Sequence, residues 1–378
     1  MRRWLARALA GVLIAGVGGG IWLSASEQRL QAESRQQLSL RGLIGSEKSA
    51  FFADPRVQAA LAAQGLTVAV DKAGSRSIAT QADPSRDDFA FPSGAPAAAQ
   101  IAGRAGSAAA GATTPFYTPM VVASWQPVAE ILVANGVARR DGALRYTLDL
   151  GRLMALMSEG RRWKDLTGSA AFPSGKSVLV ASTDLRSSNS ASMYLALLSY
   201  AANHEQVVRS RAEVEAVVPQ VADFFLRQGF QDGSSSEPFQ DFLALGMGKT
   251  PLLLAYESQL VQHWLQHRPA PAAGSAPTAG GGGAAPMVVL YPQPTLYSKH
   301  VLVPFNEGGR RLARALDSDP TLRELAQEHG FRTSGQAQGP AGWRARGVDL
   351  PDSLVDVIDP PSQEWLESMI TGVLARQP

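Results

Sequence analysis

Strand-like and helix-like segments alternate along this chain of 378 residues. Residues 40–45 have the pattern of a short apolar strand, and residues 66–70 have that of a second one. Between them, Asp54 and Pro55 open a helical pattern that ends near Gly65, because aspartate caps helices, proline starts them and glycine ends them. A strand, a helix and a strand in this order predict neighbouring parallel strands and therefore a fold of the α/β class.

The same alternation returns in the rest of the chain. Further strands are expected at residues 116–123, 177–181, 251–256 and 287–291. Further helices are expected at residues 150–158, 191–203, 212–228 and 310–315. Two stretches rich in Ala, Gly and Pro, residues 94–114 and 269–286, lack the apolar residues that would offset the entropy of ordering. We expect both to be surface loops, the first with room for a short Ala-rich helix.

The N-terminal segment combines a basic start with an uncharged stretch. Three arginines come first, and no charged residue occurs from position 8 to position 26. That length suits a membrane-spanning helix better than the shorter apolar core of a cleaved signal, and the arginines would stay in the cytoplasm. We expect residues 1–26 to be an anchor and residues 27–39 a polar stalk. Cleavage near Ala25 and a buried soluble helix are the alternatives.

Composition and motif spacing exclude several classes of function. Lys and Arg total 35 against 33 Asp and Glu, so the chain lacks the basic surplus of a nucleic-acid binder. It contains no cysteine, which excludes disulfides, thiolate metal sites and Cys nucleophiles. Two Gly-Lys-Ser/Thr triplets, at 175–177 and 248–250, lack the upstream glycine of a phosphate-binding loop. His263 and His267 have metal-binding spacing, but no carboxylate completes a motif. We expect no catalytic residue, metal or cofactor.

Polar turns follow three of the expected strands, at residues 45–49, 73–77 and 182–190. In an open parallel sheet, ligands bind beyond the carboxyl ends of the strands, and helix N-termini offer unpaired N–H groups to anions. Converging turns of this kind would form a site for a small anion. In the alternative interpretation, each serine or asparagine is only a helix cap or turn former.

The order of these turns resembles that of the type II periplasmic solute-binding proteins, the molybdate- and phosphate-type binding proteins of ABC importers. The resemblance runs from about residue 40 to residue 332. Its motifs are Gly45-Ser46-Glu47-Lys48, Gly74-Ser75-Arg76, Asp88 to Ser93, Ser182-Thr183-Asp184, Ser188-Asn189-Ser190, Tyr256-Glu257-Ser258, Tyr291-Pro292 with Pro294-Thr295, and Gly330-Phe331-Arg332. It implies two α/β lobes that are joined by two crossing strands and hold the ligand between them.

The resemblance also implies how the chain divides. The first lobe would comprise residues 40–117 and 295–378, with an amphipathic tail helix packed on it. The second lobe would comprise residues 118–294, including the flexible stretch 269–286. The crossings would be residues 118–123 and 288–295.

The residues that this resemblance assigns to the ligand come from both lobes. Ser46 and Ser75 would offer hydroxyls from the first lobe, and the helix start at residues 188–190 would offer donors from the second. Glu47 adds a negative charge beside the expected anion, which Lys48, Arg76 or Arg186 would have to offset. The full expected set is Ser46, Glu47, Lys48, Ser75, Arg76, Thr183, Asp184, Arg186, Ser188, Asn189, Ser190 and Tyr256.

The function that the resemblance implies is that of an exported, membrane-tethered and monomeric receptor on the periplasmic side of the bacterial inner membrane. It would close over a small solute, an oxyanion, for ABC-type uptake, with an inner-membrane permease as partner. The alternative is a tethered interaction or sensor protein that keeps the fold, has a degenerate cleft and binds another membrane protein. Neither hypothesis involves nucleic acid.

Overall fold

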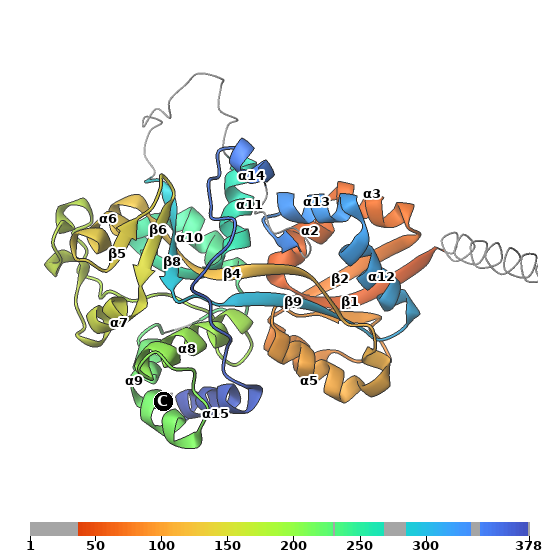
Figure 1. The fold of residues 1–378 in the computed structure, drawn as a ribbon, viewed down its shortest axis with the longest axis horizontal. Helices are drawn as coiled ribbons and strands as arrows, with labels where there is room; N and C mark the ends of the chain where they lie inside the picture. The colour runs from red at the N-terminus through yellow and green to blue at the C-terminus, as the bar shows by residue number, and fades with distance from the viewer. Residues whose placement is uncertain (1–36, 230, 268–284, 334–340, 377–378) are drawn as a thin grey trace, which may run out of the picture.

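The computed structural model describes residues 37–376 except for residue 230 and residues 268–284 and 334–340. A mixed sheet runs through the molecule with helices on its faces (Figure 1). Its strands lie in the order β2-β1-β3-β9-β4-β8-β6-β5, and β7 and β10 also pair with β4. Within the described residues, no helix has the length and apolar character needed to cross a bilayer. The expected anchor, residues 1–26, lies outside them.

The first strands form the predicted parallel arrangement. Strand β1 (Leu38–Gly45) pairs in parallel with both β2 (Leu66–Ala73) and β3 (Phe89–Phe91), so the carboxyl ends of all three strands lie at one edge. Asp54 accepts a hydrogen bond from the Arg56 backbone N–H, which confirms it as the cap of the following helix. The helices here are α2 (Ser49–Ala53), α3 (Pro55–Ala63), α4 (Ser75–Gln81) and α5 (Ala95–Ala105).

The remaining elements follow in chain order. They are β4 (Thr113–Trp125), α6 (Gln126–Ala134), β5 (Ala138–Arg140), β6 (Arg145–Asp149), α7 (Leu150–Ser158), α8 (Asn189–Ala202), α9 (Arg211–Leu226), α10 (Ser236–Lys249), β7 (Leu252–Tyr256) and α11 (Glu257–His267). After these come β8 (Met287–Gln293), β9 (Tyr297–Pro304), α12 (Glu307–Ser318), α13 (Pro320–Glu328), β10 (Arg332–Thr333), α14 (Ala341–Ala345) and α15 (Gln363–Leu374).

Strand β4 connects the two halves of the molecule. Its first part pairs with β9 and β10, and its second part pairs with β7 and β8. The chain returns through Thr295, whose hydroxyl donates to the Met120 carbonyl at 2.7 Å. We call the half built from β1–β3, β9, β10, α2–α5, α12 and α13 lobe 1, and the half built from β5–β8 and α6–α11 lobe 2. Lobe 1 has an apolar cluster on each face of its sheet, and lobe 2 has one large cluster.

Helix α15 packs on lobe 2, which corrects the expectation that the tail helix packs on the first lobe. Leu366, Met369, Ile370 and Val373 form one stripe of this helix and are buried in the lobe 2 cluster, against α9 and α8. Figure 1 shows the chain crossing from α14 past β4 and β9 to reach this position. The apolar stripe was readable in the sequence, but the helix surface that it covers was not.

Two further expectations differ from the structure. Residues 95–105 form α5, the Ala-rich helix for which the expected loop left room, and it is longer than expected because Ala97, Ala98 and Ile101 bury one of its faces against lobe 1. The expected strand at residues 177–181 makes only two isolated bridges, Arg162 with Ser177 and Ala181 with Leu253. The expected flexible stretch falls largely outside the described residues.

Candidate functional site

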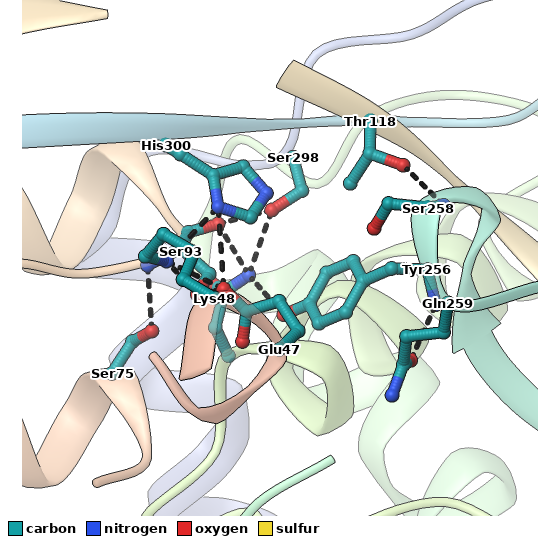
Figure 2. A network of polar contacts seen from close by, with 11 residues as sticks. Glu47, Lys48, Ser75, Ser93, Thr118, Tyr256, Ser258, Gln259, Ser298 and His300 are labelled. Atoms are coloured by element: carbon teal, nitrogen blue, oxygen red, sulfur yellow. Dashed lines mark hydrogen bonds and ion pairs between the residues drawn. The ribbon is translucent and has the colours of Figure 1, made fainter. Parts of the chain in front are cut away.

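Polar turns from both lobes meet at the carboxyl ends of β1, β2 and β3. Figure 2 shows Glu47 and Lys48, which follow β1, beside Ser75, Ser93 and side chains of lobe 2. Ser46 and Ser75 are each 3% exposed, and so is Ser188 at the start of α8. Lys48, Ser75 and Asn189 each bind Ser93, so the three distant turns of the sequence analysis converge on this residue. Polar side chains of the protein itself occupy the space between them.

Lys48 lies at the centre of this junction and is fully buried. Its ammonium binds the Glu47 carboxylate at 2.5 Å, Ser93 Oγ at 3.0 Å and His300 Nδ1 at 3.0 Å. It also lies 4.8 Å from the ring centroid of Phe91, a cation–π distance. The three donors of an ammonium are thus all used within the protein.

The ionisable groups in this junction shift each other's pKa values. Burial alone would raise the pKa of Glu47, but the Lys48 ammonium and His300 outweigh burial and hold that pKa well below its usual range. Burial, and then the Lys48 charge, lower the pKa of His300 to about 4, so that imidazole is neutral at pH 7. His300 Nδ1 lies 3.0 Å from the Lys48 ammonium and 3.2 Å from Glu47 Oε1, so this ring nitrogen faces both members of the buried ion pair. Lys48 is therefore the cation that offsets Glu47.

Asn189 is the main contribution of lobe 2. Its amide nitrogen lies 3.0 Å from the Ser93 carbonyl, 3.2 Å from the Tyr256 hydroxyl and 3.3 Å from Ser298 Oγ. Ser75 Oγ accepts from the Ser93 backbone N–H at 2.8 Å and so fixes the same turn from within lobe 1. The network therefore joins β3, β9 and α4 of lobe 1 to α8 and β7 of lobe 2.

The two lobes also meet at the N-terminus of α4. The backbone N–H groups of Arg76 and Ser77 donate to the Ser187 carbonyl of lobe 2 at 2.9 and 3.3 Å. Free N–H groups at a helix N-terminus are the groups that an anion would use. Here a carbonyl oxygen of the same chain accepts from them.

Other residues of the expected set bind elsewhere. Arg186 forms a two-pronged ion pair with Asp184 and is 66% exposed. The Arg76 guanidinium binds Glu367 of α15. Thr183 and Ser190 share a hydrogen bond of 2.7 Å inside lobe 2, which Ser188 extends at 2.9 Å. These charged and hydroxyl groups are thus not directed at a common ligand position in this closed arrangement.

A cavity of about 490 Å³ opens beside the buried junction and has walls from both lobes. Ligand pockets typically measure ~300–1,000 Å³. Lobe 1 contributes the segment after β1 and the end of β2, and lobe 2 contributes α10 and α11. The lining residues are Ser46, Glu47, Ser49, Ala50, Lys72, Ser236, Phe239, Gln240, Leu243, Ala244, Gln259, Gln262, His263, Gln266 and His267.

The sequence analysis missed most of this cavity. Gln259, Gln262, His263 and Gln266 recur at helical spacing, so a polar face of α11 could have been read from the sequence. Their meeting with the segment after β1 depends on tertiary structure. His263 and His267 stack with ring centroids 4.4 Å apart. Within the described part of the chain, no group of three or more His, Cys, Asp or Glu side chains is arranged to hold a metal.

The sequence has no matching family model and no match among curated proteins. Solved structures do resemble the molecule. The periplasmic binding protein P5PA has a TM-score of 0.55 at 11% identity, over 90% of this chain and 99% of that chain. AfuA from Actinobacillus pleuropneumoniae, with exogenous fructose-6-phosphate bound, has a TM-score of 0.52 at 11% identity, over 89% and 97%. Iron-bound HitA from Pseudomonas aeruginosa has a TM-score of 0.51 at 11% identity, over 89% and 97%.

The fold is that of the type II periplasmic solute-binding proteins. The fold expected from the order of the polar turns is thereby confirmed. In this periplasmic-binding-protein fold, the junction around Lys48 and the adjoining cavity both lie between the lobes.

Proposed function

We propose that the protein is a two-lobed receptor that binds a small polar solute in the cavity between its lobes. One observation carries the proposal: a cavity of about 490 Å³ with walls from both lobes borders a buried polar network at the strand ends. Closure of the lobes around such a solute would be a hinge motion at β4 and at the segment between β8 and β9. We infer binding without covalent chemistry.

Further parts of the proposal concern the cellular location of the receptor and its protein partner. An exported receptor that residues 1–26 hold on the periplasmic side of an inner membrane, as a monomer, would deliver its solute to a permease of the ABC type. An oxyanion would use the N–H groups at the start of α4, and it would have to replace the Ser187 carbonyl there. Ser46, Ser75 and Ser188 remain its proposed hydroxyl contacts.

Isothermal titration calorimetry tests solute binding directly. The purified protein would be titrated with sulfate, phosphate, molybdate, several amino acids and several sugars. Ala50 lines the cavity and Ala59 lies exposed on α3 away from it, so Ala50→Trp and Ala59→Trp form a matched pair. We expect at least one solute to release or absorb heat, and Ala50→Trp alone to abolish the signal. Equal binding by both variants would place the solute elsewhere and reject the cavity.

A second candidate function is a sensor or interaction protein with a degenerate cleft. It is favoured by the direct contacts that Arg76, Ser77 and Asn189 make across the lobes, since these contacts use donors that a solute would need. Silence across the whole panel, together with crosslinking to one defined membrane protein, would support this candidate against the receptor.

A further inference from the structure

The cavity between the lobes is lined by charges that the protein already compensates. The described lining residues include two histidines, His263 and His267, and two charged side chains, Glu47 and Lys72. The Glu47 carboxylate binds Lys48 and Ser93. The Lys72 ammonium binds Glu237 at 2.9 Å. A charged solute that enters here would lose hydration without meeting an unpaired opposite charge, which is costly.

The same wall offers uncharged groups that can both donate and accept. Gln240 and Gln266 line the cavity, and within the described residues their carboxamides bind no other group of the protein. Gln262 also lines the cavity, and its amide nitrogen lies 3.0 Å from His329 Nδ1. Ser49 Oγ is buried and has no hydrogen-bond partner among the residues that the structure describes. Carboxamides and hydroxyls of this kind suit ligand hydroxyl groups, which also donate and accept.

An apolar surface completes the wall. Phe239 lines the cavity, is 5% exposed and stacks on Phe242 with a centroid distance of 6.2 Å, so its ring is fixed in position. Leu243 lies one turn further along α10. Rigid aromatic and aliphatic groups beside a few polar groups give a surface for the C–H face of a ring-shaped solute.

We propose that this cavity binds an uncharged, polyhydroxylated solute of the sugar or polyol class. The proposal rests on the proposed receptor function and names its ligand class. This ligand class differs from the oxyanion expected from the sequence. Lys48, the cation that offsets Glu47, is itself buried and bound to other groups of the protein.

Calorimetry with charged and uncharged forms of the same molecule tests the ligand class. The purified protein would be titrated with glucose, trehalose and myo-inositol, with glucose 6-phosphate, and with inorganic phosphate and sulfate. We expect binding of at least one uncharged compound, and binding about tenfold weaker or worse for glucose 6-phosphate than for glucose, because the phosphate finds no unpaired cation.

A pair of variants tests whether the solute binds in this cavity. Gln240→Glu removes an amide donor from the wall, whereas Gln220→Glu makes the same change at an exposed position of α9. We expect Gln240→Glu to weaken binding of the uncharged compound about fivefold or more and Gln220→Glu to leave it unchanged.

The outcomes separate the two proposals. Tighter binding of phosphate, sulfate or glucose 6-phosphate that is weakened by Gln240→Glu and blocked by Ala50→Trp would keep the receptor and overturn the uncharged ligand. Binding of a sugar that neither substitution affects would overturn the cavity as its site. Silence across all the compounds would overturn both proposals.

Discussion

Lys48 is the residue on which the junction between the lobes depends. Replacing it with methionine leaves the Glu47 carboxylate buried without its cation, and breaking a buried pair in this way typically costs about 3–5 kcal/mol. We expect Lys48→Met to lower the free energy of unfolding by that amount in urea titrations. The double variant Glu47→Gln, Lys48→Met should lose less than the single one, because it removes both charges together.

Lys72 is the matched control for this substitution. Its ion pair with Glu237 is half exposed, at 55% and 47%, and such surface pairs contribute about 0–1 kcal/mol. Lys72→Met should therefore leave the unfolding free energy nearly unchanged. Equal losses in Lys48→Met and Lys72→Met would contradict a structural role for the buried pair.

His300 makes the stability of the junction depend on pH. Its pKa is lowered from 6.5 to about 4, by burial first and then by Lys48. Between these pH values the unfolded chain binds a proton that the folded protein does not, so stability falls as pH decreases from about 6.5 to 4, by on the order of 3 kcal/mol. The lowered pKa of Glu47 adds a further loss below its ordinary value of 4.5, in the same direction.

Unfolding free energies measured at several pH values would show this slope. We expect His300→Asn to flatten it between pH 6.5 and 4, whatever its effect on absolute stability. His204 is exposed, so His204→Asn is the control and should keep the wild-type slope. An unaltered slope in His300→Asn would assign the acid sensitivity to other groups.

Sequence reasoning anticipated part of this junction. It identified Ser46, Glu47, Lys48 and Asn189 because they follow strands or start a helix, where backbone donors and polar side chains collect. Tyr256 entered only through the family resemblance. It did not identify His300, which is a single histidine within an otherwise ordinary strand. A residue of that kind acquires a role only from the neighbours that antiparallel pairing of β9 with β3 and β4 brings to it.

At the scale of elements, the start of α4 sets how closely the lobes approach. A Cβ atom on Gly74 would lie 2.4 Å from the carbonyl oxygens of both Ser187 and Gly233, which belong to lobe 2. Backbone atoms cannot move aside as side chains can, so Gly74→Ala should push α4 away from lobe 2. We expect faster hydrogen exchange at the Arg76 and Ser77 amides, while the apolar cores keep their protection.

Gly103, on the solvent side of α5, gives the control for this change. A Cβ there would meet no atom within 4 Å, so Gly103→Ala should leave exchange at α4 unchanged and stabilise the helix by about 0.5–1 kcal/mol. Unaltered exchange at Arg76 and Ser77 in Gly74→Ala would show that the lobes do not meet there in solution.

The elements themselves were predictable where local signals were strong. Leu150–Ser158 has helical spacing after a capping aspartate, and the helix has those bounds. Residues 178–181 are apolar and include two valines, yet they form no regular strand, because a strand needs a neighbouring edge and β7 offers only one bridge at Ala181. Strand pairing is decided by tertiary structure, so such a run cannot be assigned from its own residues.

At the scale of the whole molecule, the segment from α14 to α15 fastens one lobe to the other. Trp343 Nε1 donates to the Gln327 carbonyl of lobe 1 at 2.6 Å, and Arg346 donates to the Leu265 carbonyl of lobe 2 at 2.6 Å. Further along, Thr295 pairs with Val357 beside the hinge. We call residues 341–374 the C-terminal strap.

A buried ion pair holds the middle of this strap. Arg332 of β10 binds Glu257, the first residue of α11, at 2.7 and 2.9 Å, and both side chains are at most 4% exposed. The same guanidinium donates to the carbonyls of Pro351 and Asp352 at 2.8 Å each. The strap is therefore a third connection between the lobes, besides β4 and the return through Thr295. A hinge motion that opens the lobes would have to move the strap as well.

The end of the strap also contacts lobe 1 directly. Glu367 of α15, a helix packed on lobe 2, binds the guanidinium of Arg76 at the start of α4. Arg76 is the residue whose backbone N–H reaches the Ser187 carbonyl, so the ion pair and this backbone contact hold the same turn. Because the side chains of Arg76 and Glu367 are partly exposed, at 23% and 40%, their pair should contribute about 0.5–1 kcal/mol to closure.

Glu367→Gln tests whether the strap holds the lobes closed. Losing that contribution should speed hydrogen exchange at the Arg76 and Ser77 amides about two- to fivefold, without changing the protection of the α8 and α9 core on which α15 packs. Glu364→Gln changes an exposed residue of the same helix and should have no effect. If both variants exchange alike at Arg76 and Ser77, closure depends on the buried junction alone. If Glu367→Gln also exposes the α8 and α9 core, the residue supports the packing of α15 instead of bridging the lobes.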